Sequence, residues 1–205
     1  KDIVIGMLQS LSMKSYSPDL FAQFGLSVFD ECFEYDTRVL TEHGNVCIGD
    51  LYLAWKGGME LPKILSYNVN TKKFEYKPLI YASKKKTKYF VNVQYEDAYG
   101  DIDSFICTER HKILTTGGYV EAQDLVGLHQ IVGYDKDRGG QLYRVRKTTP
   151  IIYDEEYIEV FDIEVKDNHN FIIKNVFTNV VVSNCHHISA EVFSRSLFKI
   201  VTPYM

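Results

Sequence analysis

Short runs of alternating apolar and polar residues fill the middle of the chain. A period of two residues puts the apolar side chains on one face of a β-strand, which is typical of a sheet with one buried face. Pairs such as Gly44-Asn45 and Gly117-Gly118 separate the runs and indicate turns. The runs predict strands at Thr37 to Leu40, Lys63 to Val69, Lys73 to Tyr81, Tyr89 to Tyr95, Ser104 to Cys107, Lys112 to Thr115, Ile158 to Val165, Phe171 to Lys174 and Val180 to Val182. The pattern therefore predicts an all-β domain.

Other parts of this region give different signals. The stretch from Asp135 to Pro150 combines two adjacent glycines with mixed charges and has the least periodicity, so we predict an exposed, mobile loop. The lysine cluster Lys84-Lys85-Lys86, with Lys88, predicts a solvated hairpin or edge strand rather than a phosphate site. Apolar surroundings predict a packing role for Cys47, Trp55, Tyr67, Tyr95 and Cys107.

The two ends of the chain are patterned differently. Ile3 to Leu8 and Leu26 to Phe29 are apolar runs that predict strands, and Ser17-Pro18-Asp19 predicts the start of a helix between them. Near the other end, apolar residues recur at helical spacing after Ser189. We therefore expect short α/β segments on either side of the β domain. The chain divides into three segments, namely 1–31, 32–184 and 185–205.

Composition and charge narrow the range of functions. The chain has 205 residues, of which 45% are hydrophobic and 14% aromatic, enough for one good-sized core. With 23 basic and 27 acidic residues and a net charge of -4, it does not have the positive balance that broad nucleic-acid binding needs. The 4 cysteines form no Cys-x-x-Cys pair, which argues against a zinc or disulfide framework. No apolar run reaches about 20 residues and the start does not resemble a signal peptide, so we expect no membrane contact and a cytoplasmic or nuclear, reducing compartment.

The candidate chemistry lies at the two boundaries of the β domain. Cys32 follows Glu31 at one boundary, and Cys185 follows Asn184 at the other. The Cys32 thiol could attack the carbonyl of Glu31 and convert a resonance-stabilised amide into a more reactive thioester. Such a shift needs a hydrogen-bonding group and a general acid nearby.

Thr108 and His111 offer a hydroxyl and an imidazole close together in the chain. Alone, the Thr-x-x-His spacing is weak evidence, because a histidine in such a place is more often a hydrogen-bonded structural residue. The spacing gains weight from three further local signals that occur with it in a fixed order.

Four segments of the chain, in order, resemble the motifs of inteins, the self-excising protein-splicing elements of the Hint (hedgehog/intein) family. They read CFEYDTRVLTEHG, CTERHKILTTGGYVEAQDL, VFDIEVKDNHNFI and VVVSN, the last followed by Cys185. The resemblance covers the chain from Cys32 to Asn184. It implies a horseshoe-shaped β fold whose two ends meet at one site, and autocatalytic protein splicing that excises residues 32–184 and joins Glu31 to Cys185.

The resemblance implies four intramolecular steps. Cys32 forms a thioester with Glu31, and Cys185 attacks that thioester to give a branched intermediate. Asn184 then cyclises to a succinimide and releases the insert, after which the remaining thioester relaxes to an amide. Intramolecular positioning supplies effective molarities of about 10⁵ to 10⁸ M. We therefore expect a single-turnover reaction in a monomer, with no cofactor, no metal and no partner.

Matching motif positions imply a role for four further side chains. Thr108 and His111 resemble the pair that polarises the first scissile bond and protonates its nitrogen. Asp162 resembles the acid that links the thioester to the attack by Cys185; without the resemblance, a strand-edge or turn carboxylate is an equal interpretation. His169 resembles the histidine that assists cyclisation of the final asparagine.

One position departs from the family pattern. Most inteins have a histidine immediately before the final asparagine, where this chain has Ser183. A hydroxyl can donate a hydrogen bond to the scissile carbonyl but cannot act as a strong acid near neutral pH. We therefore expect His169 to carry more of the third step, or that step to be slow. The stretch between Leu125 and Phe161 is too short for a homing endonuclease and has no acidic catalytic motifs, so the chain resembles a mini-intein.

The joined flanks resemble a superfamily 2 DExH-type helicase. The apolar run that ends in Asp30-Glu31 would be followed directly by Cys185-His186-His187. The likeness implies that Asp30 binds Mg²⁺, that Glu31 orients the attacking water and that His187 is the last residue of the motif. Because the chain has no Gly-x-x-x-x-Gly-Lys phosphate loop, Mg²⁺, ATP and nucleic acid are expected only for the complete spliced helicase.

Other interpretations remain open. Cys32 and His111, with an Asn or Asp, could form a cysteine autoprotease that cleaves without ligation. The insert could also be a degenerate intein or a non-catalytic module of the host. A further hypothesis concerns regulation, because Cys32 and Cys185 are expected to lie close together and could form a disulfide under oxidation.

Overall fold

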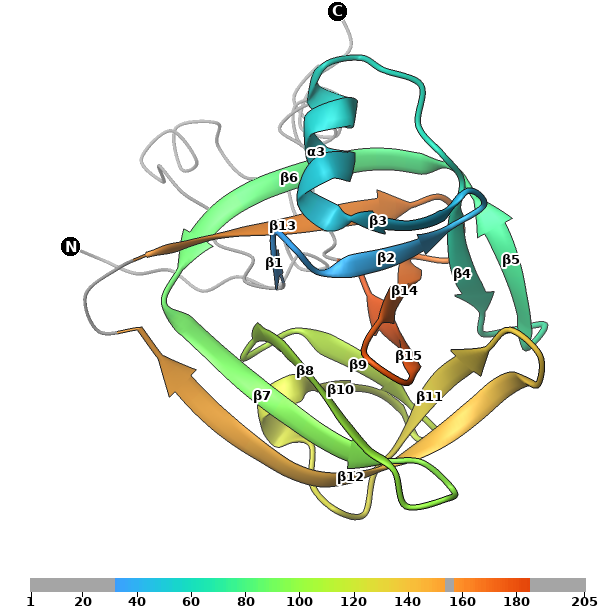
Figure 1. Cartoon of the computed structure of the whole chain (residues 1–205), viewed down its shortest axis with the longest axis vertical. Helices are drawn as coiled ribbons and strands as arrows, with labels where there is room; N and C mark the ends of the chain where they lie inside the picture. Colours follow the sequence, from blue (N-terminus) through green and yellow to red (C-terminus); the bar gives the residue numbers. More distant parts are fainter. Residues whose placement is uncertain (1–31, 154–156, 185–205) are drawn as a thin grey trace, which may run out of the picture. The chain divides into compact units, whose positions relative to one another are not determined.

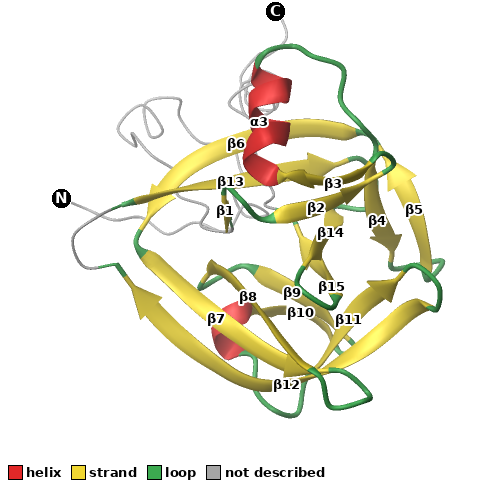
Figure 2. Ribbon diagram, in the orientation of Figure 1, coloured by secondary structure: helices red, strands yellow, loops and turns green. Residues whose placement is uncertain are grey.

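The structure is a computed structural model that describes residues 32–153 and 157–184 (Figure 1). The predicted segments 1–31 and 185–205 lie outside the described residues. The described elements are β1 (Phe33–Glu34), β2 (Arg38–Thr41), β3 (Gly44–Cys47), α3 (Ile48–Lys56), β4 (Ile64–Asn68), β5 (Lys73–Lys77), β6 (Leu79–Thr87), β7 (Tyr89–Glu96), β8 (Ile102–Thr108), β9 (Lys112–Thr115), β10 (Gly118–Glu121), η1 (Ala122–Asp124), β11 (Gln130–Asp135), β12 (Gly139–Ile152), β13 (Ile158–Val165), β14 (Asn170–Lys174) and β15 (Asn179–Ser183). Strands dominate, as Figure 2 shows, so the prediction of an all-β domain is confirmed.

The described strands form two sheets. In the smaller sheet, β13 pairs with β1 on one side and with β6 on the other. The larger sheet has the order β5-β4-β2-β14-β15-β9-β11-β12-β7-β8, with β10 on β9 and β3 on β2. Only Lys88 separates β6 from β7, so the chain passes directly from one sheet into the other at that residue (Figure 1).

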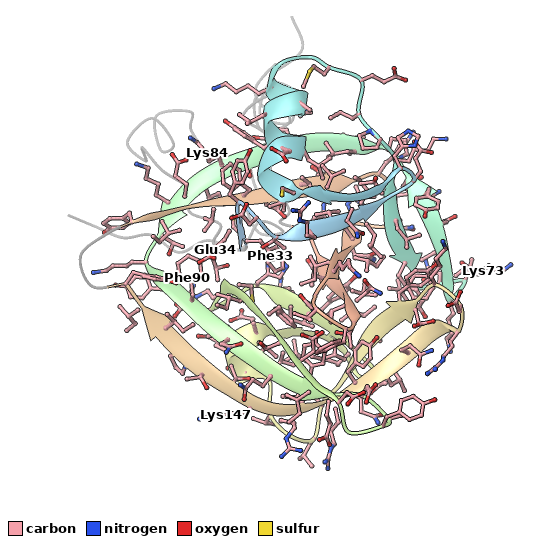
Figure 3. All side chains as sticks on the ribbon, viewed as in Figure 1. Phe33, Glu34, Lys73, Lys84, Phe90 and Lys147 are labelled. Carbon is pink, nitrogen blue, oxygen red and sulfur yellow. The ribbon has the colours of Figure 1, made fainter. Side chains whose placement is uncertain are left out.

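Apolar side chains from both sheets form the core. Phe33, Phe90 and Phe171 are buried and belong to its hydrophobic clusters. Figure 3 shows Phe33 and Phe90 inside the ribbon, whereas Lys73 and Lys147 point away from it. Apolar side chains are buried because their exposure to water is unfavourable, and charged side chains stay at the surface because their removal from water is costly.

The alternation of apolar and polar residues predicted the positions of most strands correctly. Each strand predicted between Thr37 and Val182 overlaps an observed one, and the predicted run from Lys73 to Tyr81 is two strands, β5 and β6. The strands predicted at Ile3 to Leu8 and Leu26 to Phe29 lie outside the described residues. The break falls at Pro78, which has no N–H to donate to a sheet ladder. The residues predicted to serve packing do so: Cys47, Tyr95 and Cys107 are buried, and Trp55 and Tyr67 pack against the core clusters.

Helix α3 was not predicted from the sequence. Its buried residues Ile48 and Leu51 have helical spacing, but the element is only 9 residues long. Cys47 occupies the N-cap and makes no side-chain cap hydrogen bond. The usual start signal, a Ser, Thr, Asp or Asn at the cap, is therefore missing.

The prediction of a mobile loop from Asp135 to Pro150 is wrong. This stretch contains the turn of a hairpin and most of β12, which pairs with β11 and then with β7. Tyr143 and Val145 are buried and alternate with the exposed residues Leu142, Arg144 and Arg146, but the register shifts between Val145 and Lys147. That bulge interrupts the alternation, and the mixed charges hid the remaining pattern.

Lys84, Lys85 and Lys86 lie on β6, an edge strand of the smaller sheet, as predicted, and Lys88 follows that strand. Lys84 is exposed and donates to Glu159 on the neighbouring strand β13 at 2.8 Å. Charged side chains on an edge strand hinder pairing with another chain. No helix within the described ranges is long and apolar enough to cross a membrane.

Candidate functional site

Cys32 is tied at its backbone to Thr108. The Cys32 N–H donates to Thr108 Oγ1 at 2.9 Å, and the Thr108 N–H donates to the Cys32 carbonyl at 3.0 Å. Both residues have no exposed surface. Thr108 ends β8 at this point, so a fixed sheet residue holds the nitrogen that the first step would release.

The Cys32 side chain lies in an apolar setting. It forms a small cluster with Phe90 and Val160, and Ile106 and Tyr153 pack against that cluster. Such walls keep water from a thiol and from any thioester that it forms. A dry site of this kind favours acyl transfer to another nucleophile over hydrolysis.

His111 lies in the turn between β8 and β9. Its N–H donates to the Thr108 carbonyl at 3.0 Å, and its own carbonyl accepts from Ala122 N at 2.8 Å. The buried imidazole packs against Phe33, with the ring centroids 4.3 Å apart and the rings inclined by 60°. Because Phe33 directly follows Cys32, this contact holds the imidazole beside the N-terminal boundary.

Asp162 is a fully buried residue in the centre of β13. β1 pairs with β13 in the register Phe33 to Phe161 and Glu34 to Val160. Extending this antiparallel register by one residue sets Asp162 opposite Cys32. Asp162 therefore follows the partner of Phe33 along β13, toward the Cys32 end of β1.

The C-terminal boundary is held by two hydrogen bonds. The Asn184 N–H donates to the His169 carbonyl at 3.1 Å, and Ser183 Oγ donates to the Asn184 carbonyl at 2.8 Å. Asn184 is 1% exposed, and neither of its side-chain amide atoms has a hydrogen-bond partner within the described ranges. The carbonyl that this amide would attack is therefore already hydrogen-bonded by a hydroxyl.

His169 approaches Asn184 through its backbone. Its side chain is 47% exposed, and Nδ1 lies 3.8 Å from Glu164 Oε1. Its φ of 50° is in the left-handed region, which non-glycine residues seldom adopt. The residue that the sequence assigned to the third step is thus beside Asn184, but the contact that the structure gives is a main-chain carbonyl.

Both boundaries approach the turn from Thr108 to His111. β15 pairs with β9 through Val182 and Ile113. Extending that antiparallel register by two residues sets Asn184 opposite His111. Cys32 reaches the same turn through its two hydrogen bonds with Thr108.

Five residues named from the sequence lie outside the described residues: Asp30, Glu31, Cys185, His186 and His187. Two polar residues were missed, Asn168 and Asn170, which hold the turn before β14. The sequence signal was their place beside His169 in an Asn-His-Asn run. Among residues 32–153 and 157–184, no group of three His, Cys, Asp or Glu side chains is arranged to hold a metal ion.

Comparison with known proteins gives structural matches alone. No protein-family model matches the chain, and no curated protein matches its sequence. Among solved structures, a bacterial intein-like domain from Clostridium thermocellum has a TM-score of 0.60 and 21% identity, over 75% of this chain and 99% of that one. A DnaB intein from Synechocystis has a TM-score of 0.57 and 19% identity, over 75% of this chain and 97% of that one.

A DnaX mini intein from Spirulina platensis is also similar, with a TM-score of 0.51 and 22% identity, over 77% of this chain and 99% of that one. Each of these domains is covered almost completely. At such identities the likeness concerns the fold. The described residues therefore have the β fold of inteins, the Hint fold that the sequence predicted.

Proposed function

We propose that residues 32–184 excise themselves by protein splicing and join Glu31 to Cys185. The observation that supports this most is the approach of both ends of the segment to the Thr108 to His111 turn. The N-terminal end does so through the hydrogen bonds of Cys32, and the C-terminal end through the pairing of β15 with β9. Splicing needs both scissile bonds at one site, because the same acyl group passes between them.

In the first step the Cys32 sulfur attacks the Glu31 carbonyl. A carbon–sulfur bond forms, the carbon–nitrogen bond breaks, and the departing nitrogen takes up a proton. Thr108 Oγ1 accepts a hydrogen bond from this N–H at 2.9 Å and so fixes its direction. His111, packed on the next residue Phe33, is the proposed general acid.

In the second step the Cys185 sulfur attacks the thioester and releases the Cys32 thiol. The attacking thiol has to lose its proton, since the thiolate is the nucleophile. Asp162 is the proposed acceptor of that proton. Two observations support this role. Asp162 is buried, and it directly follows Phe161, the residue of β13 that pairs with Phe33.

In the third step the Asn184 amide nitrogen attacks its own backbone carbonyl. The ring closes to a succinimide, and the peptide bond to Cys185 breaks. Ser183 Oγ donates to that carbonyl at 2.8 Å, so negative charge that develops on the oxygen meets a donor already in place. Ser183 thereby supplies the polarisation, and His169 the further assistance, in a chain without the usual histidine.

In the last step the thioester between Glu31 and the Cys185 sulfur passes to the Cys185 amine and becomes an amide. Because every step is intramolecular, the reaction is proposed to need no cofactor, metal or partner and to occur in a monomer. The segment is further proposed to be a mini-intein that cleaves no DNA. The joined flanks would form the DExH motif of a helicase, which would use ATP and Mg²⁺ only as a complete protein.

The test follows the purified chain over time by intact mass spectrometry and gel electrophoresis. Splicing gives the free segment 32–184 with a succinimide end and a product in which residues 1–31 are joined to 185–205. Cys32→Ala should prevent the thioester, and Asn184→Ala should stop the reaction at the branched species. Release of the segment without joined flanks would indicate a cysteine autoprotease, and a chain as inert as both variants would indicate a degenerate intein.

A further inference from the structure

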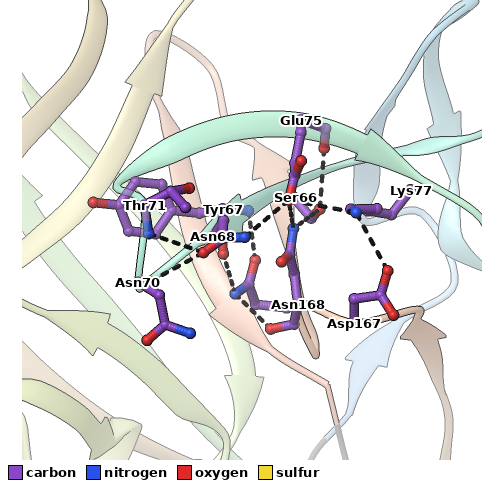
Figure 4. Close-up of polar contacts among 10 residues, drawn as sticks. Ser66, Tyr67, Asn68, Asn70, Thr71, Glu75, Lys77, Asp167 and Asn168 are labelled. Carbon is purple, nitrogen blue, oxygen red and sulfur yellow. Dashed lines mark hydrogen bonds and ion pairs between the residues drawn. The ribbon is translucent and has the colours of Figure 1, made fainter.

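A polar network connects the β4–β5 hairpin with the turn that precedes His169. Figure 4 shows Ser66 and Glu75 of the hairpin on one side and Asn168 on the other. Asn168 Nδ2 donates to Ser66 Oγ at 2.8 Å and to Glu75 Oε1 at 3.1 Å. Lys77, at the end of β5, donates to Asp167 Oδ2 at 3.3 Å. The splicing steps described above use none of these side chains.

Asn170 is the most buried member of this network, with no exposed surface. Its Oδ1 accepts from Tyr67 N at 2.7 Å, and its Nδ2 donates to Tyr67 O at 2.7 Å and to Asn168 O at 2.9 Å. Tyr119 OH on β10 accepts a longer bond at 3.2 Å. The Asn170 side chain thus hydrogen-bonds to the backbone N–H and carbonyl of Tyr67 on β4 and to the backbone carbonyl of Asn168 in the turn.

The turn itself has an unfavourable backbone. Asp167 and His169 have φ values of 67° and 50°, a region in which the side chains of non-glycine residues are crowded. Such conformations persist where the surrounding contacts over-determine them. Asn168 and Asn170 supply those contacts from either side of His169.

The shape of this turn reaches Asn184 through one hydrogen bond. The His169 carbonyl accepts the Asn184 N–H at 3.1 Å, and the next pair in the ladder is Asn170 with Ser183. The position of the His169 carbonyl therefore fixes the backbone of the residue that has to cyclise. It also fixes Ser183, whose hydroxyl donates to the Asn184 carbonyl.

We propose that Asn168 and Asn170 are positioning residues for cyclisation of Asn184, holding the left-handed turn against the β4–β5 hairpin so that the His169 carbonyl orients the Asn184 backbone. This inference rests on the proposed splicing reaction. Misplacement of about 1 Å can cost roughly 10²-fold in an intramolecular step. The N-terminal thioester has its own supports in Thr108 and His111, so it should be affected much less.

The main test is Asn170→Asp, which keeps the size of the side chain but removes the Nδ2 donor. Two rates are measured on the same protein, namely N-terminal cleavage induced by added thiol and appearance of the succinimide end by mass spectrometry. We expect cyclisation to slow by about tenfold to 100-fold, with thiol-induced cleavage within about twofold of the unchanged chain. Equal loss of both rates, or loss of neither, would refute the inference.

Asn179→Asp is the matched control. Asn179 also lies on the larger sheet and donates through Nδ2 to a backbone carbonyl, that of Tyr134 at 2.8 Å. It sits at the start of β15, whereas Asn184 follows the end of that strand. The control should leave both rates near those of the unchanged chain, and a similar slowing of cyclisation in it would count against a specific role for Asn170.

A reciprocal exchange keeps the test valid if Asn170→Asp does not fold. Asn168→Asp sets a second carboxylate against Glu75 and should slow cyclisation. Adding Glu75→Gln restores the hydrogen bond in the opposite direction, because position 75 then donates and position 168 accepts. The double variant should therefore recover most of the cyclisation rate. No recovery in a folded double variant would refute the inference. An unchanged chain that forms neither thioester nor succinimide would instead refute the proposed splicing itself.

Discussion

The N-terminal and C-terminal boundaries of the β domain are organised differently. At the N-terminal boundary, Thr108 and His111 are completely buried and contact Cys32 or its neighbour directly. At the C-terminal boundary, the His169 side chain is 47% exposed and the residue holds Asn184 by a main-chain carbonyl. Single side chains should therefore control the first step, whereas the geometry of a supported turn should control the third.

The largest expected effect is that of His111→Gln. This change keeps a polar, planar side chain of similar size but removes a group that can transfer a proton near neutral pH. General acid catalysis contributes about 10² to 10⁴-fold, so thiol-induced N-terminal cleavage should fall by that factor. Cyclisation of Asn184 should fall less, and an equal fall in both would erase the distinction between the boundaries. Because His111 is buried, the thermal unfolding midpoint is also measured, and a value near that of the unchanged chain shows that the variant is still folded.

Thr108→Val should have the next largest effect. Valine has nearly the same shape, but it leaves the buried Cys32 N–H without its acceptor, which costs about 1 to 3 kcal/mol. We expect N-terminal cleavage to slow by roughly tenfold to 100-fold, measured with added thiol. Thr115→Val is the control, because it removes another buried threonine hydroxyl, one that bonds Gly118 O at 2.7 Å. Similar slowing in both variants would make the Thr108 effect one of general stability.

Ser183→Ala tests the polarised carbonyl at the other boundary. Loss of one donor to a charge that develops in the transition state costs about 10² to 10³-fold where the donor is essential. We expect about tenfold for a neutral hydroxyl, seen as accumulation of the branched species. Ser183→Thr retains the hydroxyl and should retain most of the rate. Unchanged cyclisation in the alanine variant would remove Ser183 from the mechanism.

His169→Ala and His169→Gly separate the ring from the backbone. Both remove the imidazole, but only glycine adopts a φ near 50° without crowding. If the ring assists cyclisation, both variants should accumulate branched or N-terminally cleaved species to a similar extent. If the carbonyl is what acts, the glycine variant should be the faster by severalfold. Ligation yield unchanged in both would exclude His169 from the third step.

The smallest effect concerns pH and stability. Hydrogen bonds from Asn168 and Asn68 lower the pKa of the Glu75 carboxyl from 4.5, and bonds from Arg146 and Arg144 lower the pKa of Glu96. A carboxyl group whose pKa is lower in the folded state than in the unfolded state stabilises the fold at any pH above its unfolded pKa. This stabilisation is lost as the pH falls through the folded pKa. The urea midpoint should therefore drop below about pH 4.5.

Glu75→Gln should reduce this drop slightly, measured as the difference in urea midpoint between pH 7 and about pH 3. Glu60→Gln, at an exposed position, serves as the matched control. An identical drop in all three proteins would show that the Glu75 network contributes nothing measurable. That result would also weaken the view that the C-terminal boundary depends on a supported turn.

The strands were predictable because alternation is local. A run such as Tyr89 to Tyr95 shows its two faces without any knowledge of its partners, and β7 begins at Tyr89. The strand β12 was not predicted, because its bulge and charges obscure the alternation until β7 and β11 are seen beside it. Helix α3 was missed because its N-cap carries no capping side chain.

The candidate site was predictable as a set of residue types and only partly as an arrangement. Cys32, Thr108, His111 and Asn184 were named from the chemistry that they offer. The structure bonds Cys32 to Thr108 and pairs β15, the strand before Asn184, with β9, the strand after His111. Asn170 was passed over, because an asparagine in a short polar run usually indicates no more than a turn. Its bonds to Tyr67 depend on a strand 103 residues earlier in the chain.

By itself, the sequence determined the fold class and named the candidate reactive groups, because side-chain alternation and the chemistry of a side chain are local properties. The tertiary structure decided what those groups can do to one another. The Cys32 to Thr108 bond joins residues 76 positions apart, and its geometry follows from long-range strand register. The pairing of β14 with β15 likewise brings the Asn184 N–H to the His169 carbonyl, 15 positions earlier in the chain. No local pattern encodes those distances, because they arise only when separate strands pair and pack.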